Sequence, residues 1–283
     1  MTKVSTIIAL IVISFSRASA VDFVTARGIG MGQTVVLSNP TASSLLLVPC
    51  GGLGRQRGKI ELGILRKFEM KDLDQGYLVG AYRFGSFTYS LGLTQFGYGD
   101  YYAERMVRLS GCYHLKSLTF GVSGSLKQID FGGRYANLSA GSIGLGFSYR
   151  TGRVVIAGVV EDVNRPRLDQ FSEKLRPKYT LYAELIGRGS YSVTGKITFQ
   201  DTEKPGFGLG QRITLSSMAA VFWGVSTAPI IYGGGLELIH KRSLITYATS
   251  YHPTLGFSHT VSLGFMIGKT GSAANDKSKK RGH

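Results

Sequence analysis

Cysteine and proline are scarce in this chain, and their scarcity excludes several classes of protein. Two cysteines, Cys50 and Cys112, cannot staple 283 residues into a disulfide scaffold. Only 7 residues are proline, and the 39 glycines show no three-residue period, which excludes collagen. So many glycines are costly inside helices, and a hydrophobic content of 43% excludes a disordered chain. The composition leaves a large β-rich protein.

Long apolar runs are also missing, apart from one short segment at the N-terminus. No later stretch holds the roughly 18 consecutive apolar residues that a membrane-spanning helix needs. Met1–Lys3 is a basic start, Val4–Phe15 is apolar, and Ala18–Ala20 is a small-residue cleavage site. These parts predict a signal peptide over residues 1–20 that is removed after Sec export. An uncleaved anchor is the alternative, which the short apolar stretch disfavours.

Apolar and polar residues alternate with a period of two through most of the remaining chain. In residues 191–200 one face carries Val193, Ile197 and Phe199, and the other carries Thr194. Such segments reach about nine or more residues, the length that a tilted strand needs to cross a bilayer. The sequence therefore predicts an all-β fold, a 14-stranded antiparallel transmembrane β-barrel. We expect it to cover residues 59–268, with strands near residues 59–68, 76–84, 86–97, 106–116, 117–130, 137–150, 153–163, 178–187, 190–201, 206–216, 217–227, 230–240, 243–252 and 255–268.

The connections between these segments alternate in length. Those after odd-numbered strands are mostly longer or more polar, and those after even-numbered strands are tight. Short periplasmic turns and longer extracellular loops are typical of bacterial outer-membrane barrels, whereas a soluble β-sandwich gives no reason for the alternation. We therefore expect the chain in the outer membrane of a Gram-negative-type bacterium, with both termini in the periplasm. Outer-membrane lipid and lipopolysaccharide are its expected partners.

Two segments lie outside the predicted strands. Residues 21–58 are too irregular to span a membrane, and Asn39 and Pro40 are suited to begin a short helix that runs through Leu47. We interpret this apolar segment as a plug inside the barrel, with a periplasmic strap beneath the barrel as the alternative. Residues 269–283 carry five basic residues and one acidic residue, which predicts a disordered periplasmic tail.

A family resemblance rests on the start of the mature chain. Ala26–Gly32 reads ARGIGMG, which resembles the glycine-rich opening of PorV/PorQ-type, FadL-like outer-membrane proteins. Val48–Leu53 is similar to the N-P-A-G-L motif of that family, although it replaces the Asn and the Ala and inserts a Gly. The resemblance implies a 14-stranded barrel with a lumenal N-terminal segment. Together with the helix start at Asn39 and Pro40, it gives the expected plug or hatch residues: Gly30, Gly32, Asn39, Pro40, Pro49, Gly51 and Leu53.

The resemblance implies two different functions. PorV/PorQ-type members serve type IX secretion by holding or receiving cargo at the outer surface, and FadL-like members pass hydrophobic small molecules with the N-terminal segment as a hatch. Because the loops are modest, we expect an accessory role in secretion or surface attachment, with secretion-system proteins or secreted cargo as partners. Uptake of hydrophobic small molecules is the alternative. The loop residues expected to contact a protein partner are Tyr101, Arg165, Arg167 and Phe171.

Patterns that carry chemistry are otherwise scarce. The five His residues lack metal-ligand spacing and no G-x-S-x-G motif stands out, so we expect no metal, no cofactor and no enzymatic activity. The formal net charge is +16, but no basic patch with interleaved aromatics indicates nucleic acid. Lipopolysaccharide phosphates and a polar lumen explain the charge better. Whether Cys50 pairs with Cys112 stays open. The charged residues expected to face the lumen, where they would pair across the interior, are Arg108, Lys127, Glu184, Lys196, Arg212 and Glu237.

Overall fold

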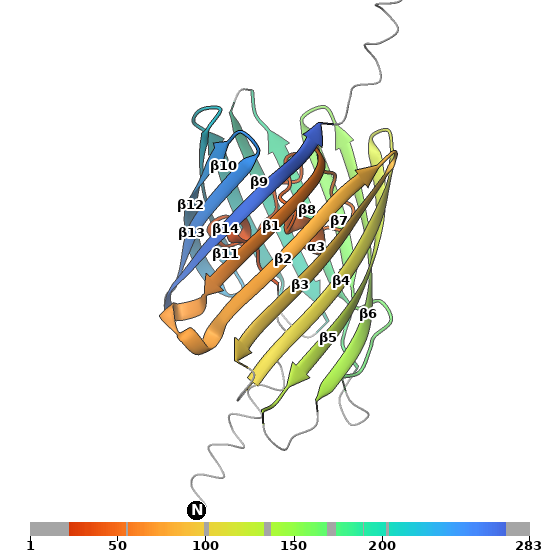
Figure 1. Ribbon diagram of the computed structural model, residues 1–283, viewed down its shortest axis with the longest axis vertical. Coiled ribbons are helices and arrows are strands. Elements are labelled where there is room, and N and C mark those ends of the chain that lie inside the picture. Colours follow the sequence, from red (N-terminus) through yellow and green to blue (C-terminus); the bar gives the residue numbers. More distant parts are fainter. Residues whose placement is uncertain are drawn as a thin grey trace, which may run out of the picture.

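Fourteen antiparallel strands form a closed ring, in which each strand pairs with its neighbours in sequence and β1 pairs with β14 (Figure 1). This computed structural model describes residues 23–54, 56–98, 102–132, 137–168, 174–188, 190–201 and 204–269. The predicted fold class is confirmed. None of the helices in the described part of the chain is long and apolar enough to span a membrane. The expected signal peptide and the tail beyond residue 269 lie outside the described residues.

The strands occur close to the positions that the alternation predicts. Their bounds are β1 (Gln56–Arg66), β2 (Asp74–Phe84), β3 (Phe87–Tyr98), β4 (Tyr102–Leu115), β5 (Leu118–Asp130), β6 (Leu138–Thr151), β7 (Val154–Glu161), β8 (Lys178–Ile186), β9 (Tyr191–Gln200), β10 (Gly206–Thr214), β11 (Ala219–Thr227), β12 (Ile230–His240), β13 (Ser243–His252) and β14 (Gly256–Lys269). β1 thus begins at Gln56 rather than near residue 59. β7 ends at Glu161 rather than near residue 163, because Asp162 has a left-handed backbone (φ 56°) that a regular strand does not contain.

The helix expected from Asn39 through Leu47 is shorter in the structure. Only the single turn α3 (Ser44–Leu47) is helical. The residue before it, Ser43, makes no side-chain cap, since its amide and hydroxyl both donate to Glu61 of β1, at 2.9 and 2.8 Å. The wall therefore fixes the chain at the point where a longer helix would begin.

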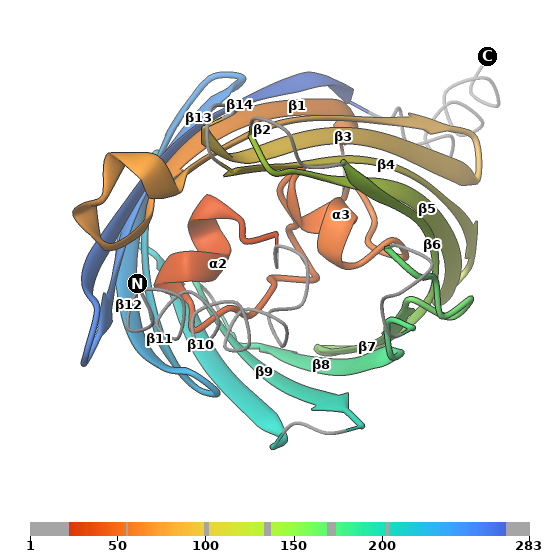
Figure 2. The same cartoon turned by 90° about the horizontal axis from the view of Figure 1, so that it is seen from below.

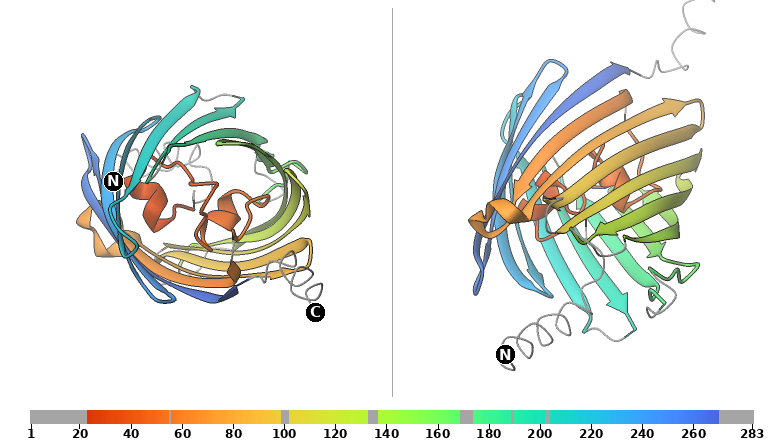
Figure 3. Two further views of the ribbon diagram at one scale, coloured as in Figure 1. Left: turned by 90° about the horizontal axis from the view of Figure 1, so that it is seen from above. Right: turned by 60° about the horizontal axis from the view of Figure 1, so that its bottom comes forward.

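Three other short helical elements complete the described chain. α2 (Ala26–Gly30) is capped by Thr25, whose hydroxyl accepts the amide of Gly28 at 2.8 Å. The 3-10 turns η1 (Lys67–Glu69) and η2 (Lys71–Leu73) form the connection between β1 and β2. α2 and α3 both lie inside the ring of strands, as views from the two ends of the barrel show (Figure 2, Figure 3).

The outer face of the barrel is apolar. Every one of the fourteen strands exposes at least one large hydrophobic side chain. In β1, for example, Ile60, Leu62 and Ile64 point outward, whereas Lys59 and Glu61 point into the barrel and are buried. A closed barrel with an apolar exterior has no exposed strand edge and satisfies its backbone internally, which are the conditions for a stable structure in lipid.

A single charge on this face should be costly if lipid covers it. Leu109, near the middle of β4, is 60% exposed. We expect Leu109→Arg to lower the free energy of unfolding by about 2–4 kcal/mol in lipid vesicles. Leu109→Phe, which keeps the site apolar, should change it by less than about 1.5 kcal/mol. Equilibrium unfolding in guanidinium chloride measures both. Equal losses would show that this face does not contact lipid.

The two ends of the barrel differ in their connections. Turns after even-numbered strands are tight, and four of them place a residue with left-handed φ directly after the strand: Gly85, Lys116, Gly152 and Lys241. β1 also begins, and β14 also ends, at this end, which we call the short-turn end (top of Figure 1). The opposite end, with the longer connections, is the loop end. In bacterial barrels the short turns face the periplasm.

Candidate functional site

One N-terminal segment fills the lumen of the barrel. Residues 23–53, which we call the plug, contain α2 and α3 and cross the interior between the strands (Figure 2). Most of these residues are buried, and Asn39 is the single exposed one among them. The structure thus places this segment in the lumen and not beneath the barrel. Any solute that passes through the barrel has to displace the plug or move along it.

Glu237 of β12 is the first of three wall carboxylates that hold the plug. It is fully buried between two guanidinium groups, with Arg27 of α2 at 2.5 Å and Arg212 of β10 at 2.8 Å. The third guanidinium nitrogen of Arg27 donates to the carbonyl of Asn39 at 2.6 Å. Because a buried charge without a partner is costly, this triad fixes α2 to the wall.

The other two wall carboxylates bind serines of the plug. Glu184 of β8 accepts the amide and the hydroxyl of Ser38, each at 2.6 Å. Glu61 of β1 accepts the amide and the hydroxyl of Ser43, at 2.9 and 2.8 Å. Hydrogen bonds to an ionised carboxylate are roughly twice as strong as neutral ones. The three carboxylates come from strands spaced around the ring, so each holds a different part of the plug.

Cations of the wall bind carbonyl groups of the plug. The ammonium group of Lys59 in β1 donates to the carbonyl of Pro40 at 2.5 Å. The guanidinium of Arg108 in β4 donates to the carbonyl of Leu46 and also pairs with Glu161, at 2.5 Å. Carbonyl oxygens near the end of a short helix otherwise lack partners, so Arg108 stabilises the end of α3.

A bulge at the end of β7 turns two consecutive carboxylates into the lumen. Glu161 follows the regular alternation and points inward, and the left-handed backbone of Asp162 directs the next side chain inward as well. Asp162 pairs with Lys127 of β5 at 3.2 Å and accepts a hydrogen bond from Ser142 of β6. Arg108 and Lys127 therefore each have a carboxylate partner from one short piece of chain.

Glycines in the wall let the plug approach closely. Gly210, Gly224 and Gly233 lie on the adjacent strands β10, β11 and β12 and face residues 29–34 of the plug. At each of the three, a Cβ atom would lie under 3.0 Å from a plug atom. The glycine content of these strands thus reflects contact between two backbones, which only a residue without a side chain permits.

The lumenal face of β7 is apolar from Val155 to Val159. The expectation of a polar lumen is wrong for this stretch, because β7 carries apolar residues on both faces, whereas the inward face of β8 also carries Thr180 and Glu184. We call the inward residues of β7, together with one residue of β8, the apolar stripe: Val155, Ala157, Val159 and Tyr182. The plug residues that pack on it are Val35, Leu37, Val48 and Cys50, with Leu47 beside them. Plug and wall therefore meet here through hydrocarbon contacts, and not through the hydrogen bonds found elsewhere.

The structure places the expected plug residues at three points of the lumen. Gly30 and Gly32 pack against β11 and β12, and Gly32 has a left-handed φ of 62°. Asn39 and Pro40 lie between the helices, where their carbonyls accept the bonds from Arg27 and Lys59. The remaining three are buried near the wall beside α3: Pro49, Gly51 and Leu53.

The expected lumenal charges all have polar partners, but few pair with one another. Among the six, only Arg212 and Glu237 form an ion pair together. Lys196 contacts the side-chain oxygen of Gln33 at 3.4 Å. Sequence reasoning missed four partners of the expected charges, Arg27, Ser38, Glu161 and Asp162. It also missed three further residues that join plug and wall: Ser43, Lys59 and Glu61. The alternation in β1 carried a signal for Lys59 and Glu61, since both occupy its polar face.

The expected loop contacts are only partly described. Arg165 and Arg167 are exposed in the connection after β7. Tyr101 and Phe171 lie outside the described residues. The structure therefore offers two of the four side chains at the loop end for a partner.

The two cysteines are buried free thiols. The thiol of Cys112 in β4 points to the carbonyl of Gly51 at 3.6 Å. The backbone of Cys50 lies against Gly121 of β5, and its sulfur lies 3.2 Å from where a Cβ would stand on Gly146 of β6. The Cys50 sulfur is thus directed to β6, whereas Cys112 lies on β4.

Burial should make Cys50 nearly inert while the plug is seated. It raises the pKa of the Cys50 thiol to about 12, so at pH 8 the thiolate is roughly a thousandfold rarer than for an exposed thiol. In a Cys112→Ser background we expect iodoacetamide to react roughly a thousandfold more slowly with folded than with denatured protein. Mass spectrometry of the alkylated peptide measures the rates. Rates within about tenfold of each other would contradict a seated plug.

Among the described residues, no group of three or more His, Cys, Asp or Glu is arranged to hold a metal ion.

Comparisons with known proteins report on the fold. No protein-family model matches the chain, and no curated protein matches it. The chain is similar in structure to the toluene transporter TbuX of Ralstonia pickettii, with 13% identity and a TM-score of 0.66, covering 88% of this chain and 100% of that one.

Two further solved structures are similar. For the P. putida toluene transporter TodX the identity is 11% and the TM-score 0.64, covering 89% of this chain and 100% of that one. For the Acinetobacter baumannii outer membrane protein Omp33 the identity is 9% and the TM-score 0.51, covering 75% of this chain and 98% of that one. At such identities the likeness establishes a shared barrel fold.

Proposed function

We propose that the chain is a non-enzymatic outer-membrane channel for uptake of hydrophobic small molecules, with the plug as its gate. The observation that carries the proposal is the apolar stripe on the lumenal face of β7 and β8. A polar lumen suits ions and sugars, whereas a hydrocarbon-lined contact between plug and wall suits an apolar solute. The fold shared with two proteins described as toluene transporters supports the same class of solute.

The apolar stripe offers a path that does not require breaking the triad of Arg27, Arg212 and Glu237. Between plug and wall, a hydrophobic solute would replace contacts among Val35, Val48, Val155 and Val159 by contacts of the same kind. Exchange of one apolar contact for another costs little, whereas separating Arg27 from Glu237 would leave buried charges alone. We infer that the solute moves along β7 and β8.

The wall is interrupted next to this path. The ladder between β6 and β7 ends at the pair Leu145 and Val160, although β6 continues to Leu138. Beyond that point one backbone bond remains, from the amide of Val163 to the carbonyl of Ile143 at 3.0 Å, and the side chain of Asn164 makes the next contacts, with its oxygen accepting the amide of Ile143 at 3.0 Å. A wall held by one backbone bond and a side chain opens more easily than a continuous ladder. We place the exit of the solute toward the lipid here.

The secretion role implied by the PorV/PorQ resemblance has less support. It depends on a protein-binding surface at the loop end, where Arg165 and Arg167 are exposed. The similar structures named above are transporters and an outer-membrane protein, and none is described as a secretion component. Normal secretion of surface cargo in a strain that lacks this chain is therefore the expected result.

Uptake by matched variants tests the channel. Val159 and Val160 are adjacent in β7 and point to opposite faces, the first into the apolar stripe. A hydroxyl buried without a partner costs about 1–3 kcal/mol, so Val159→Thr should slow toluene uptake about tenfold. Val160→Thr should leave it within about twofold, because that side chain is outside the lumen.

The measurement uses cells that lack other hydrocarbon channels. Radiolabelled toluene uptake is followed at low external concentration, with a heat-modifiability gel to show that each variant is folded. The same uptake in cells with and without the wild-type chain would overturn the proposal. Equal effects of the two valine substitutions would overturn the path along β7.

A further inference from the structure

Exposed cations gather at one end of the barrel without acidic neighbours. Seven exposed basic residues lie at the short-turn end, and we call them the cationic rim: Arg57, Lys116, Arg150, Arg153, Arg188, Lys241 and Arg242. Every acidic residue that the structure describes lies either in the lumen or at the loop end. Among the described residues, none of the seven forms an ion pair. The surface charge is therefore not spread evenly, and lipopolysaccharide at the loop end does not account for it.

The cationic rim lies beside aromatic side chains of the outer face. Tyr82, Tyr113, Tyr149 and Tyr191 point outward within a few residues of the short turns. Arg57 lies over the ring of Tyr82, with its guanidinium carbon 5.6 Å from the ring centre. Outward aromatics mark the depth of the membrane interface in barrels, so the rim stands at the level of lipid headgroups.

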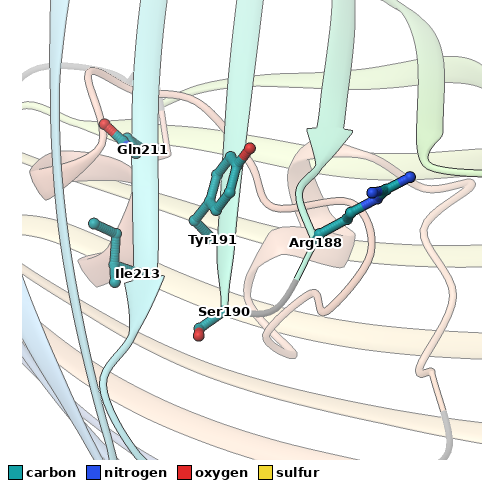
Figure 4. Close-up of a pocket in the computed structure, with 5 residues that line it drawn as sticks. All are labelled: Arg188, Ser190, Tyr191, Gln211 and Ile213. Atoms are coloured by element: carbon teal, nitrogen blue, oxygen red, sulfur yellow. The ribbon is translucent and has the colours of Figure 1, made fainter.

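A groove at the rim has the polarity of a lipid. It has a volume of about 250 Å³ and is lined by Arg188, Ser190, Tyr191, Gln211 and Ile213. These residues belong to the turn after β8 and to β9 and β10, with the ring of Tyr191 between Gln211 and Arg188 (Figure 4). Gln211 is a polar residue on an otherwise apolar face. The groove is thus cationic and polar at the rim and apolar next to it, where Tyr191 lies opposite Ile213, and Gln211 lies two residues deeper along β10.

We propose that this groove binds an anionic phospholipid from the leaflet that surrounds the short-turn end. The guanidinium of Arg188 and the hydroxyl of Ser190 bind the headgroup phosphate. Tyr191 and Ile213 pack against the first part of an acyl chain. Because short turns face the periplasm, the ligand is a glycerophospholipid of the periplasmic leaflet, and the other rim cations enrich the same lipids around the barrel.

The single tryptophan of the chain reports on this groove. Trp223 of β11 points outward, is 45% exposed and is the strand partner of Gln211. Brominated acyl chains quench tryptophan fluorescence only on contact. The purified chain is reconstituted into phosphatidylcholine vesicles that contain increasing fractions of brominated phosphatidylglycerol, and the experiment is repeated with the bromine on phosphatidylcholine. The ratio of the two quenching curves gives the preference for the anionic lipid.

The expected result is a clear preference for phosphatidylglycerol that depends on one rim cation. One cation near an anionic lipid surface strengthens binding to that surface about fivefold, so Arg188→Gln should lower the preference for phosphatidylglycerol about fivefold. Arg165→Gln, which removes an exposed cation at the loop end, should leave it unchanged. No preference in the wild type, or the same preference in both variants, would overturn the proposal.

Competition in the same vesicles distinguishes a lipid site from a site for another anion. Phosphatidylglycerol quenching that survives 50 mM inorganic phosphate supports a lipid site, and its loss would show a site for free phosphate. If lipopolysaccharide reduces the quenching of Trp223 more than unlabelled phosphatidylglycerol does, the choice of leaflet is wrong. If soluble heparin at low concentration reduces the quenching, the rim instead binds a polyanionic macromolecule.

Discussion

Cross-linking the plug to the wall through Gly146→Cys is expected to stop uptake. In a disulfide the sulfur of one cysteine lies about 3 Å from the Cβ of the other, given an S–S bond of about 2.05 Å. A Cβ on Gly146 would stand 3.2 Å from the sulfur of Cys50. The oxidant diamide takes up the two hydrogens of the thiols as the S–S bond forms. Because Gly146 lies within β6 and has no left-handed φ, the substitution adds no backbone strain.

The expected size of the effect follows from the stability of the cross-link. If the α3 half of the plug leaves the wall during passage, the covalent S–S bond prevents that step, and uptake should fall to the level of cells that lack the chain. Dithiothreitol should restore it. The background is Cys112→Ser, so that only one pair can form. Gly146→Ser adds nearly the same volume and should not respond to diamide.

Two outcomes would contradict parts of this account. A cross-link that mass spectrometry shows to be complete, with unchanged uptake, would mean that the α3 half is not the gate. Failure to form the cross-link when the protein refolds in the presence of diamide would mean that Cys50 does not face Gly146. The first result would transfer the gate to the α2 half, which has no contact with this cysteine.

The barrel was predictable because its physics is local and repetitive. Side chains alternate across a strand, so lipid on one side and protein on the other leave a period of two that sequence alone records. The alternation in β5 and β9 is complete enough to fix strand, face and length. The turns after even-numbered strands are so short that they allow only hairpins.

The same logic fails where both faces are apolar. Val154–Glu161 carries hydrophobic residues at successive positions, so its period does not say which face the lumen takes or what chemistry lines it. The left-handed turn at Asp162 depends on contacts with Lys127 and Ser142 from two other strands. Such contacts are tertiary, and no local sequence pattern predicts them.

The partners of the lumenal charges could not be predicted from the sequence for a related reason. A lumenal charge is visible as a polar residue on the expected inner face, but its partner is fixed by the register of distant strands and by the path of the plug. Glu184 pairs with a serine of the plug and not with another wall residue. The sequence could not decide between a role in secretion and a role in uptake for the same reason. The apolar stripe that favours uptake exists only once the strands are assembled.

Removing the charge of Glu237 should release the α2 half of the plug. Its carboxylate is fully buried and is the shared partner of Arg27 and Arg212. Glu237→Gln keeps the size of the side chain but leaves two buried guanidinium groups without an anion. Breaking a buried ion pair in this way typically costs about 3–5 kcal/mol. We expect a loss of that size in equilibrium unfolding, and more frequent open events in single-channel recordings.

Matched variants separate the buried triad from an ordinary surface pair. Asp130→Asn removes the partner of Arg105, an exposed pair at 3.8 Å, and should cost at most about 1 kcal/mol. Replacing Arg27, Arg212 and Glu237 together by methionine removes all three charges, and such replacements are often neutral or stabilising by about 1–4 kcal/mol. If the triple variant is as unstable as Glu237→Gln, the cost comes from lost packing and not from the orphaned charges. If Glu237→Gln is as mild as Asp130→Asn, the triad does not anchor the plug, and the plug is held by its other contacts, the serine bonds to Glu61 and Glu184 and the carbonyl bonds from Lys59 and Arg108.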